Sequence, residues 1–593
     1  MKKARRRMEK KLIFIFGMIF FVSLVMPLNL YAADTDENRK LKHEIEKFQE
    51  QLDELEERLD QTELHSATDR VSLGLELRTR VDSIRYSDIS AAPSWLMAGF
   101  FTPVGTNPNT GAAWTAAEMN AITPGDVLSM MSSMPPGTTL QDMLATNGFN
   151  GATKNYIQSM MAALAAAGAV PDAETYNAKN DMIYTNKFRL NMNAKVNQNL
   201  SFSGRLAMYK VFGDSSEVKM MNGSLGDINL DGNTSSVPHG DTVHVERAYF
   251  NYTKDVGDVP INFSLGRRPA TEGPPREYGN YSLEGGSPVA TIINWQFDGA
   301  SLSFGLEDVT GIPGAAFKLC YGVGFESGYG NSYSLSGSSI VDDATFGGFI
   351  ATLYDNDETS VVLNYAHAWD ITDGFSGTVV MPFIPYKDGE GVYTFTPNTG
   401  GYISRMEAST NIGDFDIASL VLRTNFSEYF SDIDLFVAPS WSRTHPSEIS
   451  RNPYYEMMGQ GLVSTADSEG KLESHDGYSI YAGVLFPMPF DARLGFEYNW
   501  GSEYWFNMTG AEDSLIASKL AARGQVYEAY YIQPVYRDNF FVKLGSQYYD
   551  YEYTGSGNPL GAPVKIDDLT AFDAFFPVVD TAWNTYLSAT VRF

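Results

Sequence analysis

The sequence predicts an all-β protein: a transmembrane antiparallel barrel of about 16 to 18 strands, preceded by a short N-terminal coiled-coil helix. Apolar and polar residues alternate with a period of two in many segments after residue 70. Beyond residue 33 no apolar stretch is long enough for a membrane helix, so a spanning chain must close its hydrogen bonds in a barrel. Long and short connectors also alternate, as in barrels of this class.

Residues 1–33 are predicted to be a secretory signal peptide. Lysines and arginines precede an apolar run from Leu12 to Met26, and small residues around Ala32 mark a cleavage point. An uncleaved membrane anchor is the alternative. The run is short for a bilayer helix, however, and Pro27 interrupts it.

Residues 34–66 are predicted to form a periplasmic coiled coil. Apolar residues recur at alternating spacings of four and three: Leu41, Ile45, Phe48, Leu52, Leu55 and Leu59. A helix of about three heptads is marginal alone, so we expect it to associate with copies of itself or with another partner. An amphipathic helix lying on the chain's own barrel is the alternative.

Residues 70–593 are predicted to form the barrel itself. In one clear strand, one face carries Phe188, Leu190, Met192, Ala194 and Val196, and the other carries Lys187, Arg189, Asn191, Asn193 and Lys195. An apolar face toward lipid and a charged face toward water explains this pattern. A soluble sandwich also alternates, but charges along ten-residue strands with aromatic ends favour the barrel.

Connector lengths give an independent argument for a barrel. Residues 88–181 are predicted to be a long outer-loop or lumen insertion, with a short helix near 156–167 that has Ile157, Met160, Met161 and Leu164 on one stripe. Short turns are predicted at Asn197 to Asn199 and at Asp298-Gly299, among others. An even number of strands returns the chain to the side on which it began.

The final strand ends on an aromatic residue with no tail. Trp583, Leu587, Val591 and Phe593 lie on one face of it, and Arg592 lies on the other. This ending resembles the C-terminal strand of bacterial outer-membrane β-barrels, in which the terminal aromatic residue is part of the assembly signal. The resemblance implies an outer-membrane location, contact with membrane lipid and recognition of Phe593 by a barrel-assembly machinery.

The strongest local motif begins at Gly266-Arg267-Arg268-Pro269 and continues to Pro275. With the Asn186, Gly204, Arg247 and Cys320 stretches, it resembles a family of proteobacterial outer-membrane porins that carries a domain-of-unknown-function label. The resemblance spans about residues 70 to 593 and implies location and architecture more than substrate. Neighbouring strand residues point to opposite faces, so one of Arg267 and Arg268 is expected to reach the lumen.

Charged residues on the inner face are the candidate pore-lining groups. A basic ladder is predicted from Lys187, Arg189, Lys195 and Arg205, with Arg267 and Arg268 nearby, and a second wall from Asp432, Asp434, Asp491, Arg493 and Glu497. Opposed basic and acidic walls would set a transverse field across a pore. The alternative is that these charges pair or are solvated within the lumen.

A calcium-like spacing occurs in one outer loop. Asp227, Asn229 and Asp231 alternate as in the first half of a calcium loop and are followed by Gly232. Pro238 stands where the bidentate glutamate is required, so we expect an ordinary Asx-rich loop, with calcium as the alternative. No other cofactor is expected.

Composition and motifs argue against several function classes. A net charge of −29 disfavours nucleic acid as a partner, and the single cysteine, Cys320, has no disulfide partner in the chain. Short catalytic motifs for hydrolases, metalloproteases and nucleotide enzymes are absent from the sequence, so no enzyme activity is expected. A barrel enzyme with catalytic residues dispersed on its strands is a further alternative, with His367, Asp370 and His445 as its candidates.

We therefore expect an outer-membrane porin that allows passive diffusion of ions or small polar solutes. Because many porins are trimers, the coiled coil suggests a homo-oligomer, with a trimer as the candidate. The alternative is an adhesion or scaffold protein that uses the barrel as an anchor.

Overall fold

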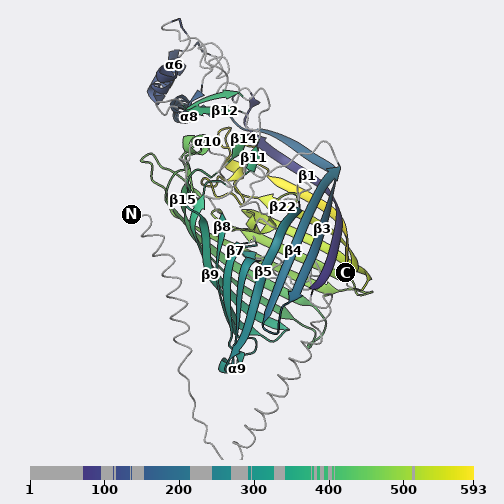
Figure 1. Ribbon diagram of the computed structural model, residues 1–593. Coiled ribbons are helices and arrows are strands. Elements are labelled where there is room, and N and C mark those ends of the chain that lie inside the picture. Colours follow the sequence, from purple (N-terminus) through teal and green to yellow (C-terminus); the bar gives the residue numbers. More distant parts are fainter. Residues whose placement is uncertain are drawn as a thin grey trace, which may run out of the picture.

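The chain forms a closed antiparallel barrel of sixteen strands (Figure 1), which confirms the predicted fold class. The computed structural model describes residues 71–94, 96, 111–112, 115–133, 135–136, 152–213, 243–268, 291–294, 297–325, 341–374, 377–379, 383–387, 393–397, 404–406, 408–509, 514–537 and 539–593. The predicted signal peptide, coiled coil and calcium candidates Asp227, Asn229 and Asp231 lie outside these residues.

The barrel strands follow one another around the wall in chain order, and the last strand pairs with the first. They are β1 (Val71–Ala91), β3 (Glu174–Lys195), β4 (Leu200–Gly213), β5 (Val243–Val256), β6 (Val259–Arg268), β7 (Phe297–Gly305), β8 (Ala316–Phe325), β9 (Ala344–Asp355), β10 (Thr359–Thr372), β15 (Asn411–Asn425), β16 (Asp434–Pro446), β19 (Asp476–Pro487), β20 (Arg493–Gly501), β21 (Gly524–Tyr536), β22 (Phe540–Tyr551) and β23 (Thr581–Arg592).

The barrel closes where β1 meets β23. Leu77 lies opposite Val591, and Arg80 lies opposite Ser588. The backbone of Phe593 completes this edge, because its N–H donates to the Leu75 carbonyl at 2.9 Å and its carbonyl accepts from the Leu75 N–H at 2.7 Å. The terminal aromatic residue is therefore part of the seam.

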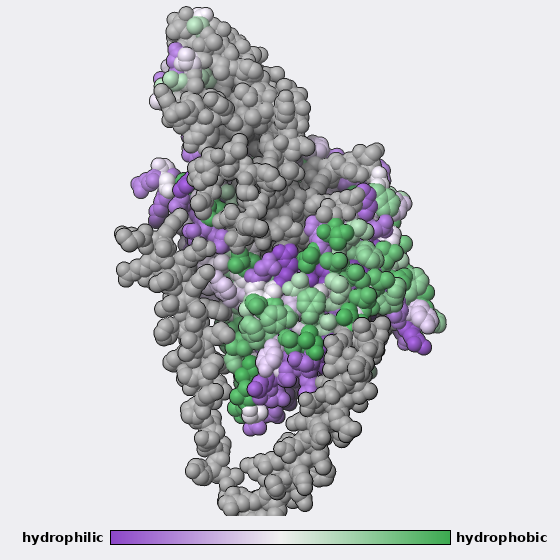
Figure 2. Space-filling view, viewed as in Figure 1, coloured by the Kyte–Doolittle hydropathy of each residue, from purple (hydrophilic) through white to green (hydrophobic). Residues whose placement is uncertain are grey.

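Apolar side chains cover the outside of the barrel. Exposed residues on this face recur on many strands and include Leu73, Phe202, Leu265, Leu353, Leu435, Ile480, Phe496, Leu544 and Leu587. Figure 2 shows hydrophobic residues gathered across the visible wall, with hydrophilic residues beyond them at the end that carries α9 (Glu307–Thr310). A closed barrel leaves no strand edge unpaired, and an apolar outer belt matches the hydrocarbon core of a membrane.

The connectors at the α9 end are short, and those at the opposite end are long. One predicted turn is wrong: Asp298 and Gly299 lie inside β7, and the true connector is the α9 segment between β7 and β8. Gly299 packs against the next strand so closely that a Cβ there would approach the Tyr321 carbonyl oxygen at 2.1 Å. A close strand approach, and not a turn, requires this glycine.

Helices and small sheets lie beyond the long-loop end of the barrel (Figure 1). The helices are α5 (Ala116–Asn120), α6 (Pro124–Ser133), α8 (Lys154–Ala167) and α10 (Pro453–Met457), and α8 confirms the predicted helix. The short strands are β2 (Ala152–Thr153), β11 (Gly377–Val379), β12 (Phe383–Lys387), β13 (Tyr393–Pro397), β14 (Ser404–Met406), β17 (Gln460–Gly461) and β18 (Ser464–Thr465). No helix in the described part of the chain is long and apolar enough to cross a membrane.

Apolar clusters continue from this outer assembly into the upper barrel. Ile157, Met160 and Leu164 of α8 are buried in the same cluster as loop residues and inward residues of the wall such as Phe415. Gln158 of α8 donates to the Met457 carbonyl at 2.7 Å. The outer helices are thus fixed on the loops that enter the barrel.

Candidate functional site

The lumen wall formed by β3, β4 and β5 carries a basic cluster around one buried carboxylate. Glu246 accepts hydrogen bonds from Arg189 at 3.1 Å and from Arg205 at 3.3 Å, and the Lys187 ammonium lies 3.9 Å from it. All four residues are buried. Strand alternation places Lys187 and Arg189 on one inner face, and antiparallel pairing with β4 brings Arg205 beside them.

A β-bulge brings Glu246 into this cluster. The β4–β5 register shifts between Arg205 and Leu206, and both Glu246 and its neighbour Arg247 are buried. Neighbouring strand residues normally point to opposite faces, so sequence alternation could not place both inside. Arg247 adds a fourth cation, while Glu76 of β1 binds Arg189 at 3.4 Å, so the cluster keeps an excess of positive charge.

A second polar cluster lies on β19 to β23 and on β1. Glu497 of β20 accepts from Tyr481 at 2.6 Å and from Tyr530 at 2.8 Å. Glu528 of β21 accepts from Tyr586 at 2.5 Å. These three tyrosines are buried, so their hydroxyl groups hold both carboxylates on the inner wall.

Lys519 joins this wall to a loop that folds into the lumen. Its ammonium is paired with Glu497 and, at 2.6 Å, with Glu528. We call residues 502–523, between β20 and β21, the inner loop. Leu520, which follows Lys519 in this loop, is buried in one apolar cluster with Tyr481 and Tyr530 of the wall. The loop backbone is therefore held well below the outer rim.

The inner loop also contacts other sectors of the barrel. The Phe506 N–H donates to Ser442 on β16, and the Ala517 carbonyl accepts from the Tyr549 hydroxyl on β22 at 3.2 Å. A second segment, 291–294, runs beside it, and Ile293 and Met508 form a parallel bridge. These two loop segments thus lie against the inner wall and narrow the lumen.

Burial changes the pKa of two ionisable groups near the two ends of the inner loop. Burial lowers the pKa of Arg523 to about 10, although its guanidinium donates to the Trp505 carbonyl at 3.0 Å and to the Thr554 carbonyl at 2.9 Å. His475 stacks on Tyr504, with ring centroids 3.9 Å apart, and burial lowers its pKa. Arg523 stays cationic at neutral pH, whereas His475 is held neutral.

The predicted acidic wall contains neutralised pairs. Asp434 binds Arg423 at 2.5 Å, and Asp432 binds Arg493 at 2.6 Å. In the turn before β16, the pKa of Asp432 is lowered by hydrogen bonding to Asn425 and by Arg493. The transverse field predicted from sequence is correspondingly reduced and stays a prediction.

The other predicted positions are spread over different surfaces. Asp491 is exposed in the turn between β19 and β20, and Lys195 is exposed at the short-connector end of β3. Arg267 lies opposite Asp298 and binds it at 2.6 Å on the outer face. Arg268 shares the opposite, inner face of β6 with Ser264. Sequence reasoning missed Glu246, Glu528 and Lys519.

The described inner wall is basic although the whole chain is acidic, with a net charge of −29. Inward carboxylates are Glu76, Asp82, Glu246, Asp434, Glu497 and Glu528. They are outnumbered by the wall cations Arg78, Arg80, Lys187, Arg189, Arg205, Arg247, Arg268, Lys318, Arg423, Arg493 and Lys543, and the inner loop adds Lys519. The acid excess therefore lies elsewhere on the chain.

One titratable cluster faces outward instead. On β10, β15 and β16, Asp416 accepts from Tyr365 at 2.6 Å and lies 2.6 Å from His367 and 2.8 Å from His445. These ring contacts resemble parts of catalytic sites, but no nucleophilic side chain accompanies them among the contacts of the described residues. In the described part of the chain, no group of His, Cys, Asp and Glu is arranged to hold a metal ion.

A closed barrel with an apolar outer belt and a charged inner wall defines a β-barrel protein of the outer membrane. The chain belongs to the family described as "Protein of unknown function (DUF3373)", whose model matches residues 177–593. No curated protein matches the chain.

Several solved structures resemble the chain at low sequence identity. OprB of Pseudomonas putida is 11% identical, with a TM-score of 0.37 over 88% of this chain and 94% of that chain. An anion-selective porin from Comamonas acidovorans is 10% identical, with a TM-score of 0.36 over 88% and 99%. OmpF of Salmonella typhi is 10% identical, with a TM-score of 0.35 over 88% and 97%. Similarity at this level leaves the solute to be argued from the lumen itself.

Proposed function

We propose that this protein is an outer-membrane porin through which ions and small polar solutes diffuse passively, with anions favoured over cations. The single observation that supports it is the excess of cationic side chains on the described inner wall. Sixteen strands enclose more space than wall side chains can fill, and a wall with more cations than carboxylates needs water or mobile anions beside it. A water-filled, positively lined lumen selects for anions.

The inner loop supports the same proposal because it shapes the passage. Lys519 fixes it to Glu497 and Glu528, so the loop backbone lies beside the wall and narrows the lumen. Size exclusion would then come from the inner loop and charge preference from the basic cluster around Glu246. Such a pore catalyses no reaction.

Self-association is part of the proposal, with a trimer joined through the heptad segment 34–66 as the candidate. The barrel would contact membrane lipid through its apolar belt and be assembled through its Phe593 end. Chemical crosslinking of the full chain in its membrane, followed by gel electrophoresis, would measure the number of subunits.

The test is single-channel conductance of the purified protein in planar bilayers, with the reversal potential under a salt gradient. We expect stable current steps and a reversal potential of the sign set by anion flow. Absence of conductance from a folded barrel would exclude the porin. A reversal potential of the opposite sign would exclude the anion preference alone.

An adhesion or scaffold protein is the second candidate. The observation that favours it is the assembly of α5, α6, α8 and α10 beyond the long-loop end of the barrel (Figure 1). Binding of a partner to this assembly, with no conductance, would support that alternative.

A further inference from the structure

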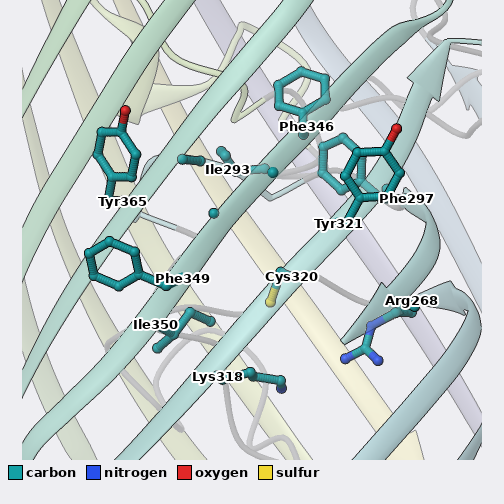
Figure 3. Close-up of a pocket in the computed structure, with 15 residues that line it drawn as sticks. Arg268, Ile293, Phe297, Lys318, Cys320, Tyr321, Phe346, Phe349, Ile350 and Tyr365 are labelled. Carbon is teal, nitrogen blue, oxygen red and sulfur yellow. The ribbon is translucent and has the colours of Figure 1, made fainter. Parts of the chain in front are cut away.

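A hollow in the inner wall lies between β6 and β9, and it contains two cationic side chains. The cavity has a volume of about 100 Å³, and its lining includes Arg268, Lys318, Cys320, Phe297 and Phe346. Figure 3 shows the charged ends of Arg268 and Lys318 pointing toward one another, with Cys320 close to both.

Strand register places these side chains on the lumen side. Lys318 pairs with Ile350 and Cys320 with Gly348, and Arg268 pairs with Phe297. Gly348, which also lines the hollow, lies where the next strand approaches closely. A Cβ on Gly348 would approach the Tyr365 carbonyl oxygen at 2.2 Å, so this position can carry no larger residue without movement of the wall.

Neither cation has an acidic partner among the described residues. No carboxylate of that part of the chain lies within 4.0 Å of Lys318 or Arg268. The Nη1 of Arg268 is buried and makes no hydrogen bond. These groups differ from Arg267, the adjacent residue, which is paired with Asp298 on the other face of the strand.

Neighbouring polar groups reinforce the same chemistry. Ser301 lies directly opposite Cys320 on β7, and Ser264 lies opposite Ser301 on β6. Both hydroxyls are buried without a hydrogen-bond partner. A wall with orphaned donors and no described acceptor is matched by an anion, because an anion accepts several hydrogen bonds at once.

Apolar side chains make up much of the remaining lining and adjoin the narrowed part of the lumen. Phe297 and Phe346 pack with ring centroids 4.9 Å apart. Ile293, which also lines the hollow, bridges Met508 of the inner loop. A ligand in the hollow would therefore place its charge at Arg268 and Lys318 and its apolar body against the two rings and Ile293.

We propose that this hollow is a binding site for small organic anions, namely carboxylates with an aromatic or branched apolar body, which pause there as they cross the lumen. The inference deepens the proposed anion-favouring porin and rests on it. An inorganic anion can use the two cations but not the apolar contacts, so the geometry favours benzoate-like solutes over phosphate.

Cys320 supplies a direct probe, because it is the single cysteine of the chain. The purified full-length protein would be treated with methanethiosulfonate reagents carrying either a sulfonate or a quaternary ammonium group. Each reagent transfers its thioalkyl group to the thiolate and releases methanesulfinate. We expect the anionic reagent to react faster than the cationic one and millimolar benzoate to slow the labelling.

Variants assign the effect to the two cations. Lys318→Met and Arg268→Met should each weaken benzoate protection by about tenfold to a hundredfold, the range expected for losing one hydrogen bond to a charged group. Arg267→Met removes a cation from the adjacent outward position and should leave protection unchanged. Heat-dependent gel mobility would establish that each variant is a folded barrel, and Arg268→Met carries the test if Lys318→Met does not fold.

The outcomes separate this inference from the porin proposal. Protection by benzoate that depends on Arg268 or Lys318 supports the site, even for a protein that shows no conductance. Equal protection by inorganic phosphate, faster reaction of the cationic reagent, or unprotected labelling of a conducting barrel would overturn it. Benzylamine and cyclohexanol, which share the apolar body without the negative charge, should give no protection.

Discussion

Glu497 and Glu528 lie directly opposite one another on β20 and β21, although like charges in that position repel. Lys519 of the inner loop lies between them and is paired with both. Removing the loop from the lumen would leave two facing carboxylates without this shared cation. The strand pair and the docked loop therefore stabilise each other.

Lys519→Met should release the inner loop. Breaking a buried ion pair from one side costs about 3–5 kcal/mol, so the loop should undock in a measurable fraction of molecules. We expect noisier single-channel currents with larger open steps. Adding Glu528→Gln to that variant removes one of the two facing carboxylates and should reduce part of the added current noise. Lys565→Met, which removes a half-exposed lysine paired with Asp567, is the matched control. Unchanged currents in Lys519→Met would argue against the loop as the constriction.

Glu246→Gln should strengthen the preference for anions. The change removes the carboxylate that Arg189, Arg205 and Lys187 share, so the excess of positive charge on that wall increases. The reversal potential under a salt gradient should shift further toward the value expected of a pore that conducts anions only. Glu448→Gln makes the same charge change at an exposed loop pair with Arg451 and should have no effect. A shift of equal size in both variants would mean that the wall does not set selectivity.

Acidification should loosen the inner loop at its Tyr504 end. Burial lowers the pKa of His475 below its ordinary value of 6.5, so the stacked form holds a neutral ring. A released histidine binds a proton more readily, and docking is therefore favoured above pH 6.5 and weakens as the pH falls below it. Proteolysis rates of the loop between pH 7.5 and 5.5 would measure this. His475→Gln should flatten the profile, and a wild-type rate independent of pH would contradict the prediction.

Leu587→Arg should destabilise the barrel in lipid. Leu587 is 49% exposed on the outer face in the middle of β23, where a charged side chain costs about 2–4 kcal/mol. Denaturant unfolding in lipid vesicles would measure the loss. Leu587→Ala removes apolar area without adding charge and should cost less. Equal stability of the two variants would argue that this face does not lie in hydrocarbon.

Local periodicity was enough to predict the barrel and the faces of its strands. The alternation of Leu587 and Ser588, or of Phe188 and Arg189, follows from a two-residue repeat that is visible within each strand segment alone. Turns were harder to predict, because no repeating pattern fixes where a strand ends. Asp-Gly is a frequent turn dipeptide, yet Asp298 and Gly299 continue a strand because the sheet needs a residue without a side chain there.

The candidate site depended on contacts that periodicity cannot encode. Glu246 reaches the lumen through a register shift, and Lys519 reaches Glu497 only because a long loop turns inward. The pairing of Arg423 with Asp434 needs the register between β15 and β16. Sequence placed Arg268 on one face of its strand but gave no sign that Lys318 and Cys320, about fifty residues later, share its hollow.

The inner loop has a further consequence for how the barrel closes. Leu515 and Ile516 are buried in one cluster with Ile84 of β1, Tyr549 of β22 and Ala582 of β23. The loop thus spans the seam between the two ends of the chain from within, where neither strand has a covalent link to the other. Its apolar contacts can form fully only after β1 and β23 have paired. Separating β1 from β23 would therefore also require these contacts to break, and we expect this to slow reopening of the closed barrel.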